Sequence, residues 1–265
     1  MGCRVIFIPT KWLGGVASPP SVFRSNVKRN LARKLPEVKP ANPRQDALYI
    51  ACAGPSLRDT AHEVEGKANV WALNGAHDYL VSRGLKPSHG VAQAPEVGIL
   101  DSFKLVRPDV EYLFASCTNP DLVDRVIAQG GKVVFWHAKC PEKWRVNYKT
   151  KDKSRYLTMG GGTVGLKALD LAYMLGFREV HCLGFDACIS DDGRIGPDLP
   201  LYEDRKQDVR IFLHKGRAFR ALPSYARQVE DFGITVRPLT GLNLTFYGDG
   251  LMQWAVKGMQ EAHEV

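Results

Sequence analysis

The sequence predicts an α/β fold with a mostly parallel sheet that carries helices on both faces. Two observations lead to this prediction. Short apolar runs of β type alternate with longer runs whose apolar residues recur at helical spacing, which is the pattern of repeated β-α units. Turns rich in Gly and small polar residues follow several of the apolar runs, as expected at the carboxyl ends of parallel strands. At 265 residues the chain can bury a sizeable core.

The charge is unevenly distributed and predicts a basic N-terminal arm and linker over residues 1–45, ahead of a domain over 46–265. The arm holds nine Lys or Arg against one Glu. Because the whole chain has 36 Lys or Arg and 28 Asp or Glu, the domain carries 27 of each sign. Residues 21–35 predict an amphipathic basic helix, and the prolines after it predict an extended linker. Such an arm could contact nucleic acid, an acidic partner or a neighbouring subunit, or it could be a solvated extension.

Composition also bears on the setting of the protein. No apolar run is long enough for a membrane span, and the opening residues fit a secretory signal peptide poorly. The six cysteines show neither C-x-x-C nor zinc-ligand spacing, which predicts a reducing, cytoplasmic setting. A disulfide between Cys182 and Cys188 is left open.

Two predicted strands, at residues 47–52 and 69–73, each end in a turn that contains glycine. The first turn lacks the G-x-G-x-x-G fingerprint of dinucleotide binding. A glycine turn with a polar residue can still direct backbone amides at a phosphate or a carboxylate. Two such turns on neighbouring strands predict a cleft. Its candidate ligand-binding residues are Gly54, Pro55, Ser56, Asn74 and Gly75.

Further strands are predicted at residues 86–91, 112–115 and 132–136, with a helix over 121–128. His137 follows the last of these strands. Histidine titrates near neutral pH, so His137 is a candidate general base, and a hydrogen-bonded structural role is the alternative. The polar stretch at 141–156, rich in Lys and Arg, predicts a mobile loop or a lid over an anionic ligand.

The stretch from residue 158 to residue 187 predicts a glycine-rich loop, a helix, a strand and an acid, in that order. Glycines can adopt positive φ and leave their amides free for an anion. A Thr then predicts the N-cap of a helix over 164–175, and a buried strand follows at 179–184. Asp186 comes just past that strand, where open α/β sheets bind ligands. A tight turn without a ligand is the alternative. The loop comprises Gly160, Gly161, Gly162 and Thr163.

The last third of the chain predicts peripheral elements. Residues 190–198 predict a solvated acidic turn, because their spacing matches no calcium-binding loop. The other predicted elements are a hairpin at 208–220 around Lys215 and Gly216, a helix at 223–232, strand or loop pieces at 235–238 and 243–247, and a final helix from 251.

These motifs together resemble those of the family grouped as 6-hydroxymethylpterin diphosphokinase MptE-like, over about residues 46–250. That family, which has many phage-encoded members, is similar in fold to bacterial sialyltransferases that hold a cytidine nucleotide on Gly-Pro-Ser and Gly-x-Asp loops. The fold implied is Rossmann-like. The segments that carry the resemblance are Cys52-Ala-Gly-Pro-Ser-Leu57, Asn74-Gly-Ala-His-Asp-Tyr-Leu80, Gly160-Gly-Gly-Thr-Val-Gly-Leu-Lys-Ala168 and Leu175-Gly-Phe-Arg-Glu-Val-His-Cys-Leu-Gly-Phe-Asp186.

The resemblance implies roles for the candidate residues. The turns at 54–56 and 74–75 would hold a nucleotide, and the loop at 160–163 would hold its phosphates or the acceptor. Asp186 would hold a metal or the ribose. One position departs from the family pattern: Ala92 stands where members commonly have an Asp. This departure puts metal-assisted catalysis in doubt, and Glu96 is the nearest acid.

Two functions follow as hypotheses. The first is a nucleotide-dependent transferase, with His137 and Asp186 as catalytic candidates and a small-molecule acceptor. It would transfer a diphosphoryl group from ATP with Mg²⁺, or a glycosyl group from a nucleotide sugar. The second is a non-catalytic phage protein that binds nucleic acid or a virion component through residues 1–45. Under either hypothesis the protein would work in the cytoplasm, and in the host cytoplasm if it is encoded by a phage. Whether it forms a homo-oligomer is left open.

Overall fold

The computed structural model describes residues 18–140, 144, 146, 148, 155–202, 206 and 208–263. Residues 1–17 of the predicted arm and most of the predicted loop at 141–156 lie outside the described residues. None of the described helices is both long enough and apolar enough to cross a membrane. The described cysteines are free thiols, so the disulfide left open between Cys182 and Cys188 does not form.

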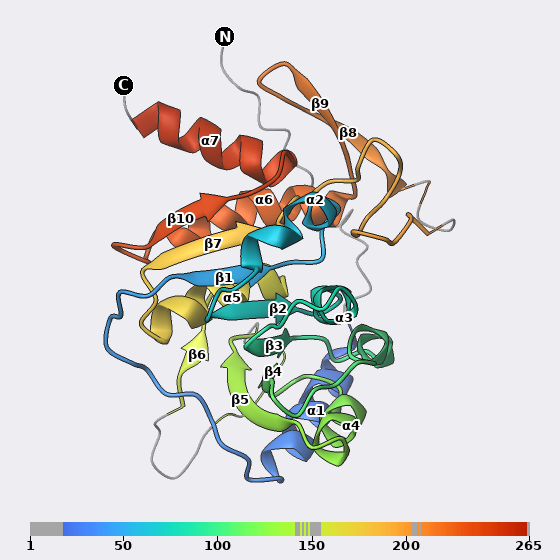
Figure 1. Cartoon of the computed structure of the whole chain (residues 1–265), viewed down its shortest axis with the longest axis vertical. Helices are drawn as coiled ribbons and strands as arrows, with labels where there is room; N and C mark the ends of the chain where they lie inside the picture. Colours follow the sequence, from blue (N-terminus) through green and yellow to red (C-terminus); the bar gives the residue numbers. More distant parts are fainter. Residues whose placement is uncertain are drawn as a thin grey trace.

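Eight strands form one sheet in the order β10-β7-β1-β2-β3-β4-β5-β6, and every pairing between neighbours is parallel (Figure 1). The predicted parallel sheet is therefore confirmed. From β1 the chain adds strands outward to β6, and then returns to place β7 on the opposite side of β1. The strand order reverses at β1, and ligands bind beside such a reversal in open α/β sheets. The strands are β1 (Leu48–Ala51), β2 (Val70–Leu73), β3 (His89–Ala92), β4 (Glu111–Ala115), β5 (Lys132–Ala138), β6 (Leu157–Thr158), β7 (Glu179–Leu183) and β10 (Asn243–Phe246).

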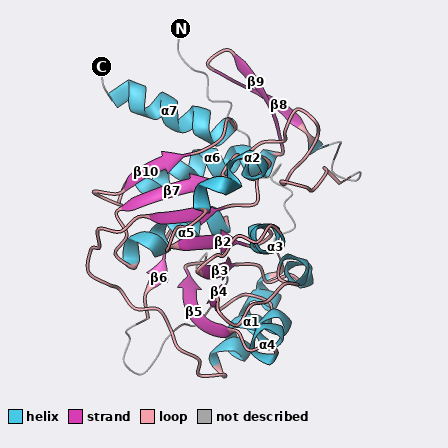
Figure 2. Cartoon of the chain, in the orientation of Figure 1, coloured by secondary structure: helices cyan, strands magenta, loops and turns pink. Residues whose placement is uncertain are grey.

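Helices cover both faces of the sheet, as the sequence predicts (Figure 2). On one face Leu48 and Ile50 of β1 pack in a core with Leu169 of α5, and on the other Ala51 packs with Leu57 and Leu80. This division follows from the alternation of side chains along a strand. The helices are α1 (Pro20–Leu31), α2 (Leu57–Thr60), α3 (Ala76–Ser82), α4 (Pro120–Ala128), α5 (Val164–Met174), α6 (Pro223–Val236) and α7 (Leu251–His263), with 3₁₀ turns at Ala61–Val64 and Val97–Ser102.

A separate antiparallel hairpin, β8 (Arg210–His214) and β9 (Arg217–Ala221), projects beside α7 (Figure 1). Lys215 and Gly216 both have positive φ, as the tight hairpin turn predicted there requires. One prediction for the last third is wrong. Thr235 belongs to the end of α6 and not to a strand or loop piece.

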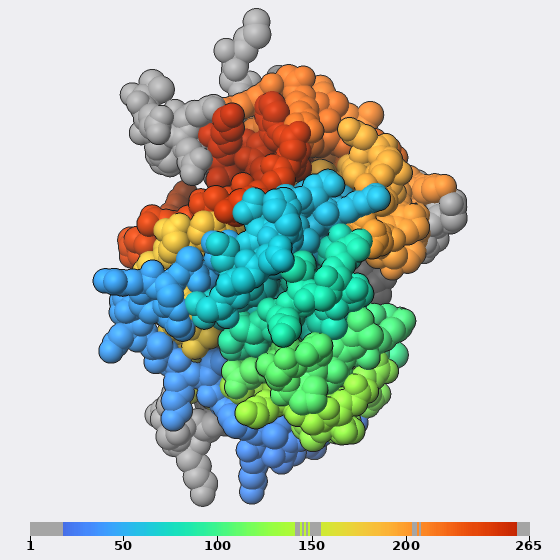
Figure 3. Space-filling view, viewed as in Figure 1, coloured from blue at the N-terminus to red at the C-terminus, as the bar shows by residue number. Residues whose placement is uncertain are grey.

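The segment at 18–45 is part of the domain, so the predicted boundary near Gln45 does not separate an arm from it. Phe23 and Val27 of α1 are buried in the main core. Farther along, the Val38 amide donates to the Phe135 carbonyl at 2.8 Å, and the Phe135 amide donates to the Pro36 carbonyl at 2.8 Å. Two residues of the predicted apolar stripe, Phe23 and Val27, are thus buried, and the segment borders the rest of the domain along the lower edge of Figure 3.

Candidate functional site

Two pockets open at the carboxyl ends of the strands, on either side of the loop at 159–164. The small pocket, of about 180 Å³, lies at the reversal point and is lined by the loops after β1, β2 and β7 and by the start of α5. The large pocket, of about 660 Å³, is lined by the loops after β3, β5 and β6 and by α1. Thr163 and Val164 line the small pocket, whereas Met159 and the three loop glycines line the large one. The glycine-rich loop is therefore a wall common to both pockets.

In the small pocket, the main chains of the loops after β1 and β7 are in direct contact. A β-carbon on Gly54 would lie 2.4 Å from the Gly184 carbonyl oxygen, and one on Gly184 would lie 2.2 Å from the Cys52 carbonyl oxygen. Gly184 also has a φ of 61°, which favours glycine. The Gly54 amide donates to the Gly184 carbonyl at 2.9 Å. This amide, predicted to face a ligand, is thus used to join the β1 and β7 loops.

Asp186 holds the same two loops together. Its carboxyl is 3% exposed and accepts hydrogen bonds from the Ser56 amide at 2.7 Å, the Ser56 hydroxyl at 2.5 Å and the Gln253 side chain at 3.0 Å. Burial raises the pKa of Asp186 against the effect of these bonds. Pro55 has no amide hydrogen to offer. The turn at 54–56 and Asp186 thus line or support the small pocket, but their polar groups are largely satisfied within the protein.

A magnesium ion does not fit at Asp186. Both carboxylate oxygens already accept hydrogen bonds from the protein. In the part of the chain that the structure describes, no group of three or more His, Cys, Asp or Glu side chains is placed to hold a metal. Magnesium is bound by carboxylates and needs near-ideal octahedral geometry, so Asp186 is a structural clamp in this arrangement.

Each pocket has a lining residue with an amide oxygen that is buried without a partner. In the small pocket this residue is Asn74, which has a φ of 45°, and in the large pocket it is Gln93. A buried acceptor without a hydrogen bond is costly and rare, and at a pocket it is the position where a ligand donor compensates. Gly75 begins α3 beside Asn74 and does not line the pocket. Asn74 was predicted from the glycine turn after β2, whereas Gln93 was not predicted.

Two of the three loop glycines are required by close packing, which the sequence did not predict. None has positive φ. A β-carbon on Gly160 would lie 2.7 Å from the Leu166 carbonyl oxygen, and one on Gly161 would lie 2.5 Å from the Leu166 side chain. Gly160 and Gly161 therefore allow the loop to pack closely on α5. The predicted N-cap is confirmed, because the Leu166 amide donates to the Thr163 hydroxyl at 3.4 Å.

Two buried ionisable residues of α5, which the sequence analysis missed, fix this loop. The ammonium of Lys167 donates to the carbonyl of Gly160 at 2.6 Å and lies 3.3 Å from those of Lys139, Thr158 and Met159. Burial lowers the pKa of Lys167 to about 8.

On the other side of the loop, Asp170 accepts from the Met159 amide, and the Gly161 amide donates to the Thr235 hydroxyl at 3.1 Å. Burial raises the pKa of Asp170. The amides predicted to bind an anion are thus partly used by the protein itself. The sequence feature that could have revealed these two residues is the presence of a Lys and an Asp inside an otherwise apolar helical run.

Helix α1 forms one wall of the large pocket. Ser18 donates to the Glu96 carboxylate at 2.7 Å, and the rings of Phe23 and Trp144 meet edge to face with centroids 5.2 Å apart. All four residues line the pocket. Glu96, considered from sequence as the nearest acid to Ala92, is the carboxylate of this pocket.

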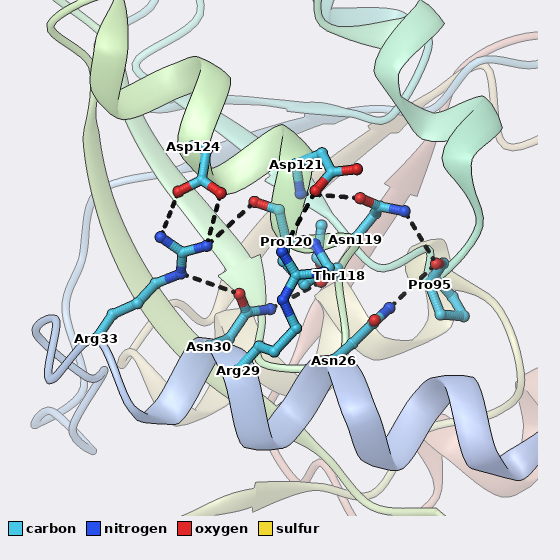
Figure 4. A network of polar contacts seen from close by, with 10 residues as sticks. All are labelled: Asn26, Arg29, Asn30, Arg33, Pro95, Thr118, Asn119, Pro120, Asp121 and Asp124. Atoms are coloured by element: carbon cyan, nitrogen blue, oxygen red, sulfur yellow. Dashed lines mark hydrogen bonds and ion pairs between the residues drawn. The ribbon is translucent and has the colours of Figure 1, made fainter.

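The same helix fixes the loops that carry the pocket residues (Figure 4). Asn26 donates to the Pro95 carbonyl at 3.1 Å, and Asn30 donates to the Ser116 and Thr118 carbonyls at 3.0 and 2.8 Å. Arg33 forms a two-pronged ion pair with an Asp of α4. The predicted amphipathic helix is therefore a structural part of the site.

His137 does not lie where the sequence analysis expected. It is inside β5, 2% exposed, and lines neither pocket. Its ring nitrogens lie 3.1 Å from the Ser116 hydroxyl and 3.0 Å from the Glu37 carboxylate. Burial lowers the pKa of His137. This geometry corresponds to the alternative interpretation, a hydrogen-bonded structural histidine, because a base must reach the substrate proton.

The parallel sheet with helices on both faces defines a Rossmann-like α/β protein. More particularly, residues 21–192 match the model of the family 6-hydroxymethylpterin diphosphokinase MptE-like, and the chain belongs to that family. No curated protein matches the chain.

The chain is similar in fold to a solved glycosyltransferase structure. The MAf glycosyltransferase from Magnetospirillum magneticum AMB-1 superposes with a TM-score of 0.62 at 13% identity, over 94% of this chain and 42% of that chain. A mammalian sialyltransferase in complex with Gal-beta-1-3GalNAc-ortho-nitrophenol gives a TM-score of 0.42 at 12% identity, over 88% and 87% of the two chains. The chain thus spans less than half the length of the glycosyltransferase.

Proposed function

We propose that the chain is a nucleotide-dependent transferase that holds a nucleotide donor at the small pocket and an acceptor hydroxyl in the large pocket. The observation that carries this proposal is the common wall at 159–164, which makes the two pockets immediate neighbours. The small pocket lies at the reversal of strand order, the usual ligand site of such sheets. Its volume of about 180 Å³ accommodates part of a nucleotide, since pockets for whole small molecules measure roughly 300–1,000 Å³.

Glycosyl transfer from a nucleotide sugar agrees best with the described residues. Diphosphoryl transfer from ATP needs Mg²⁺ held by carboxylates, and both oxygens of Asp186, the carboxylate that lines the small pocket, already accept hydrogen bonds from the protein. In glycosyl transfer the bond between the anomeric carbon and the phosphate oxygen breaks. A bond from the anomeric carbon to the acceptor oxygen forms, and the nucleotide leaves with the electron pair as its phosphate anion. The acceptor hydroxyl loses its proton to a base.

Glu96 is our candidate for that base, in place of His137. It lines the large pocket, and the Ser18 hydroxyl donates to one oxygen of its carboxylate. That bond orients the carboxylate and leaves the second oxygen for the acceptor hydroxyl, as a general base within hydrogen-bond reach requires.

The non-catalytic alternative has less support. Part of the positive charge in residues 18–45 is used inside the molecule, where Arg29 pairs with Asp121, Arg33 with Asp124 and Arg44 with Asp46. Those charges are less available to a nucleic acid than the sequence suggests.

Calorimetric titration of the full chain with CMP, CTP, ATP and GTP, each with and without Mg²⁺, tests the proposal. Metal-independent binding of a nucleotide supports glycosyl transfer, whereas Mg²⁺-dependent ATP binding would replace it with diphosphoryl transfer. Asn74→Gly removes the unpartnered amide and keeps the positive φ accessible, so we expect at least about tenfold weaker nucleotide binding. Gln129→Ala, at an exposed position after α4, is the control. Absence of binding by all four nucleotides would overturn the proposal.

A further inference from the structure

The lining of the large pocket is unusual in its charge. It contains two lysines and one carboxylate, that of Glu96. Lys139 follows β5 and is exposed, whereas Lys167 is only 4% exposed. Among the residues that the structure describes, neither lysine lies within ion-pair distance of a carboxylate. Within the described part of the chain, the pocket therefore presents positive charge that no carboxylate neutralises by direct contact.

Lys167 offers a ligand in the large pocket its positive charge but no free hydrogen-bond donor. Its three N–H groups face four backbone carbonyls, so they are already satisfied. With a pKa of about 8 it is mostly protonated at pH 7. Asp170 lies one turn away on α5, but its carboxylate accepts backbone amides and does not line the pocket. A buried ammonium at the edge of a pocket is stabilised when a ligand brings an anion beside it.

Lys139 is placed to supply the direct contact. Its side chain is exposed at the pocket, and an ammonium has three donors on a flexible stem that suit a carboxylate or a phosphate. The two lysines together thus combine a fixed buried charge with a mobile donor.

The remaining lining determines what else the ligand must offer. The Gln93 amide oxygen is buried without a donor, so a ligand hydroxyl at this position would satisfy it. Glu96 is a second acceptor, and the ring pair of Phe23 and Trp144 gives an apolar wall. Hydrogen-bond acceptors beside an aromatic wall suit a ligand with hydroxyl groups on its rim and an apolar C–H face.

We propose that the large pocket takes an acceptor of one chemical class: an anionic sugar, with hydroxyl groups toward Gln93 and Glu96 and a negatively charged group toward Lys139. The anion is a carboxylate, as in a sugar acid, or a phosphate, as in a sugar phosphate. The role as acceptor rests on the proposed function, but the recognition of an anionic sugar does not.

The test compares four probes on the full chain by calorimetry at pH 7: glucose, glucuronate, glucose 6-phosphate and inorganic phosphate. One of the two charged sugars is expected to bind at least about tenfold more tightly than glucose, with a preference that declines at high salt because the rim contact is screened. The tighter of the two identifies the anion as carboxylate or phosphate. Inorganic phosphate is expected to bind more weakly than the preferred sugar, because it cannot reach Gln93.

Variants of the lining residues test which side chains recognise the anionic sugar. Lys139→Ala is expected to reduce the preference for the charged sugar, because the direct contact is lost and only the charge of Lys167 remains, and Lys139→Arg is expected to keep the preference. Lys132→Ala is the matched control, because Lys132 is an exposed lysine at the opposite end of the same strand. Gln93→Leu is expected to weaken all sugars alike. Unfolding curves of each variant exclude loss of structure.

Two results would overturn the inference: glucose binding as tightly as both charged sugars, or a preference as large in Lys139→Ala as in the native chain. Absence of binding by every sugar would also overturn it. Nucleotide titration of the same samples separates this failure from that of the proposed function. Nucleotide binding without any preference for an anionic sugar refutes only the present inference, whereas loss of nucleotide binding refutes the transferase.

Discussion

The small and the large pocket share a wall but are held together in different ways. The small pocket depends on main-chain contact between two neighbouring loops, where Gly54 and Gly184 have no room for a side chain. The large pocket depends on side chains from segments far apart in sequence, such as Phe23 and Gln93. The small pocket therefore depends on two adjacent strands alone, whereas the large pocket forms only when α1 is docked.

The strongest way to break the small pocket is Gly184→Ala. The substitution combines a non-glycine residue at a φ of 61° with a β-carbon 2.2 Å from the Cys52 carbonyl oxygen. We expect the free energy of unfolding to fall by about 4 kcal/mol, with loss of nucleotide binding. The control is Gly162→Ala in the common wall, where a β-carbon meets nothing within 4 Å. Urea unfolding measures both, and a similar cost for the two variants would contradict the main-chain account.

The common wall can be examined through the titration of Lys167. Its pKa is about 8 in the folded chain, below the ordinary value of 10.5. Between these values the unfolded chain holds the proton and the folded chain does not, so stability rises with pH. This group should contribute an increase of about 3 kcal/mol from pH 8 to 10.5. Denaturation at several pH values should show that increase in the native chain and not in Lys167→Met or Lys167→Arg. Parallel curves for all three chains would refute it.

Asn30→Ala should break the large pocket and spare the small one. It leaves the Ser116 and Thr118 carbonyls without their donor, and Thr118 belongs to the network in Figure 4. We expect a loss of about 2 kcal/mol in the free energy of unfolding. Binding of sugars at the large pocket should weaken while nucleotide binding persists. Lys28→Ala, on the exposed side of the same helix, is the control. Equal loss at both pockets would mean that they are not independent.

The smallest effect is expected for Arg29→Ala. Arg29 and Asp121 lie 3.5 Å apart, and their side chains are 55% and 60% exposed. Such pairs contribute at most about 0.5 kcal/mol. Thermal unfolding should show almost no change, and neither pocket should lose affinity. A large loss would mean that the docking of α1 depends on its charge as well as on its asparagines.

Several features were predictable because they depend on a short stretch of chain. The helix cap at Thr163, the hairpin turn at Lys215 and the position of Asp186 after β7 all follow from local pattern. The family resemblance was also correct, because glycine turns in that order are a sequence property.

Other features could not be read from the same residues. The glycines at 160 and 161 are evident in the sequence, but the reason why glycine is needed there is not. Their close contact with Leu166 forms only when the loop folds onto α5. The strand before His137 was correctly predicted, yet the sequence did not reveal that Glu37 returns to bond the ring. Burial of α1 was missed because the basic residues of the helix indicated solvent, whereas its asparagines are bonded to loops about ninety residues away.

The sequence by itself determined the order of strands and helices, the parallel sheet and the glycine turns at its carboxyl edge, because these arise from hydrophobic periodicity and local backbone preference. Only the tertiary structure decided which polar groups remain for a ligand. It directed the amide of Gly54 and the carboxylate of Asp186 to partners within the protein, and left the amide oxygens of Asn74 and Gln93 without them. A hydrogen bond needs two groups in contact, and the contacts that matter here join segments that the sequence keeps apart.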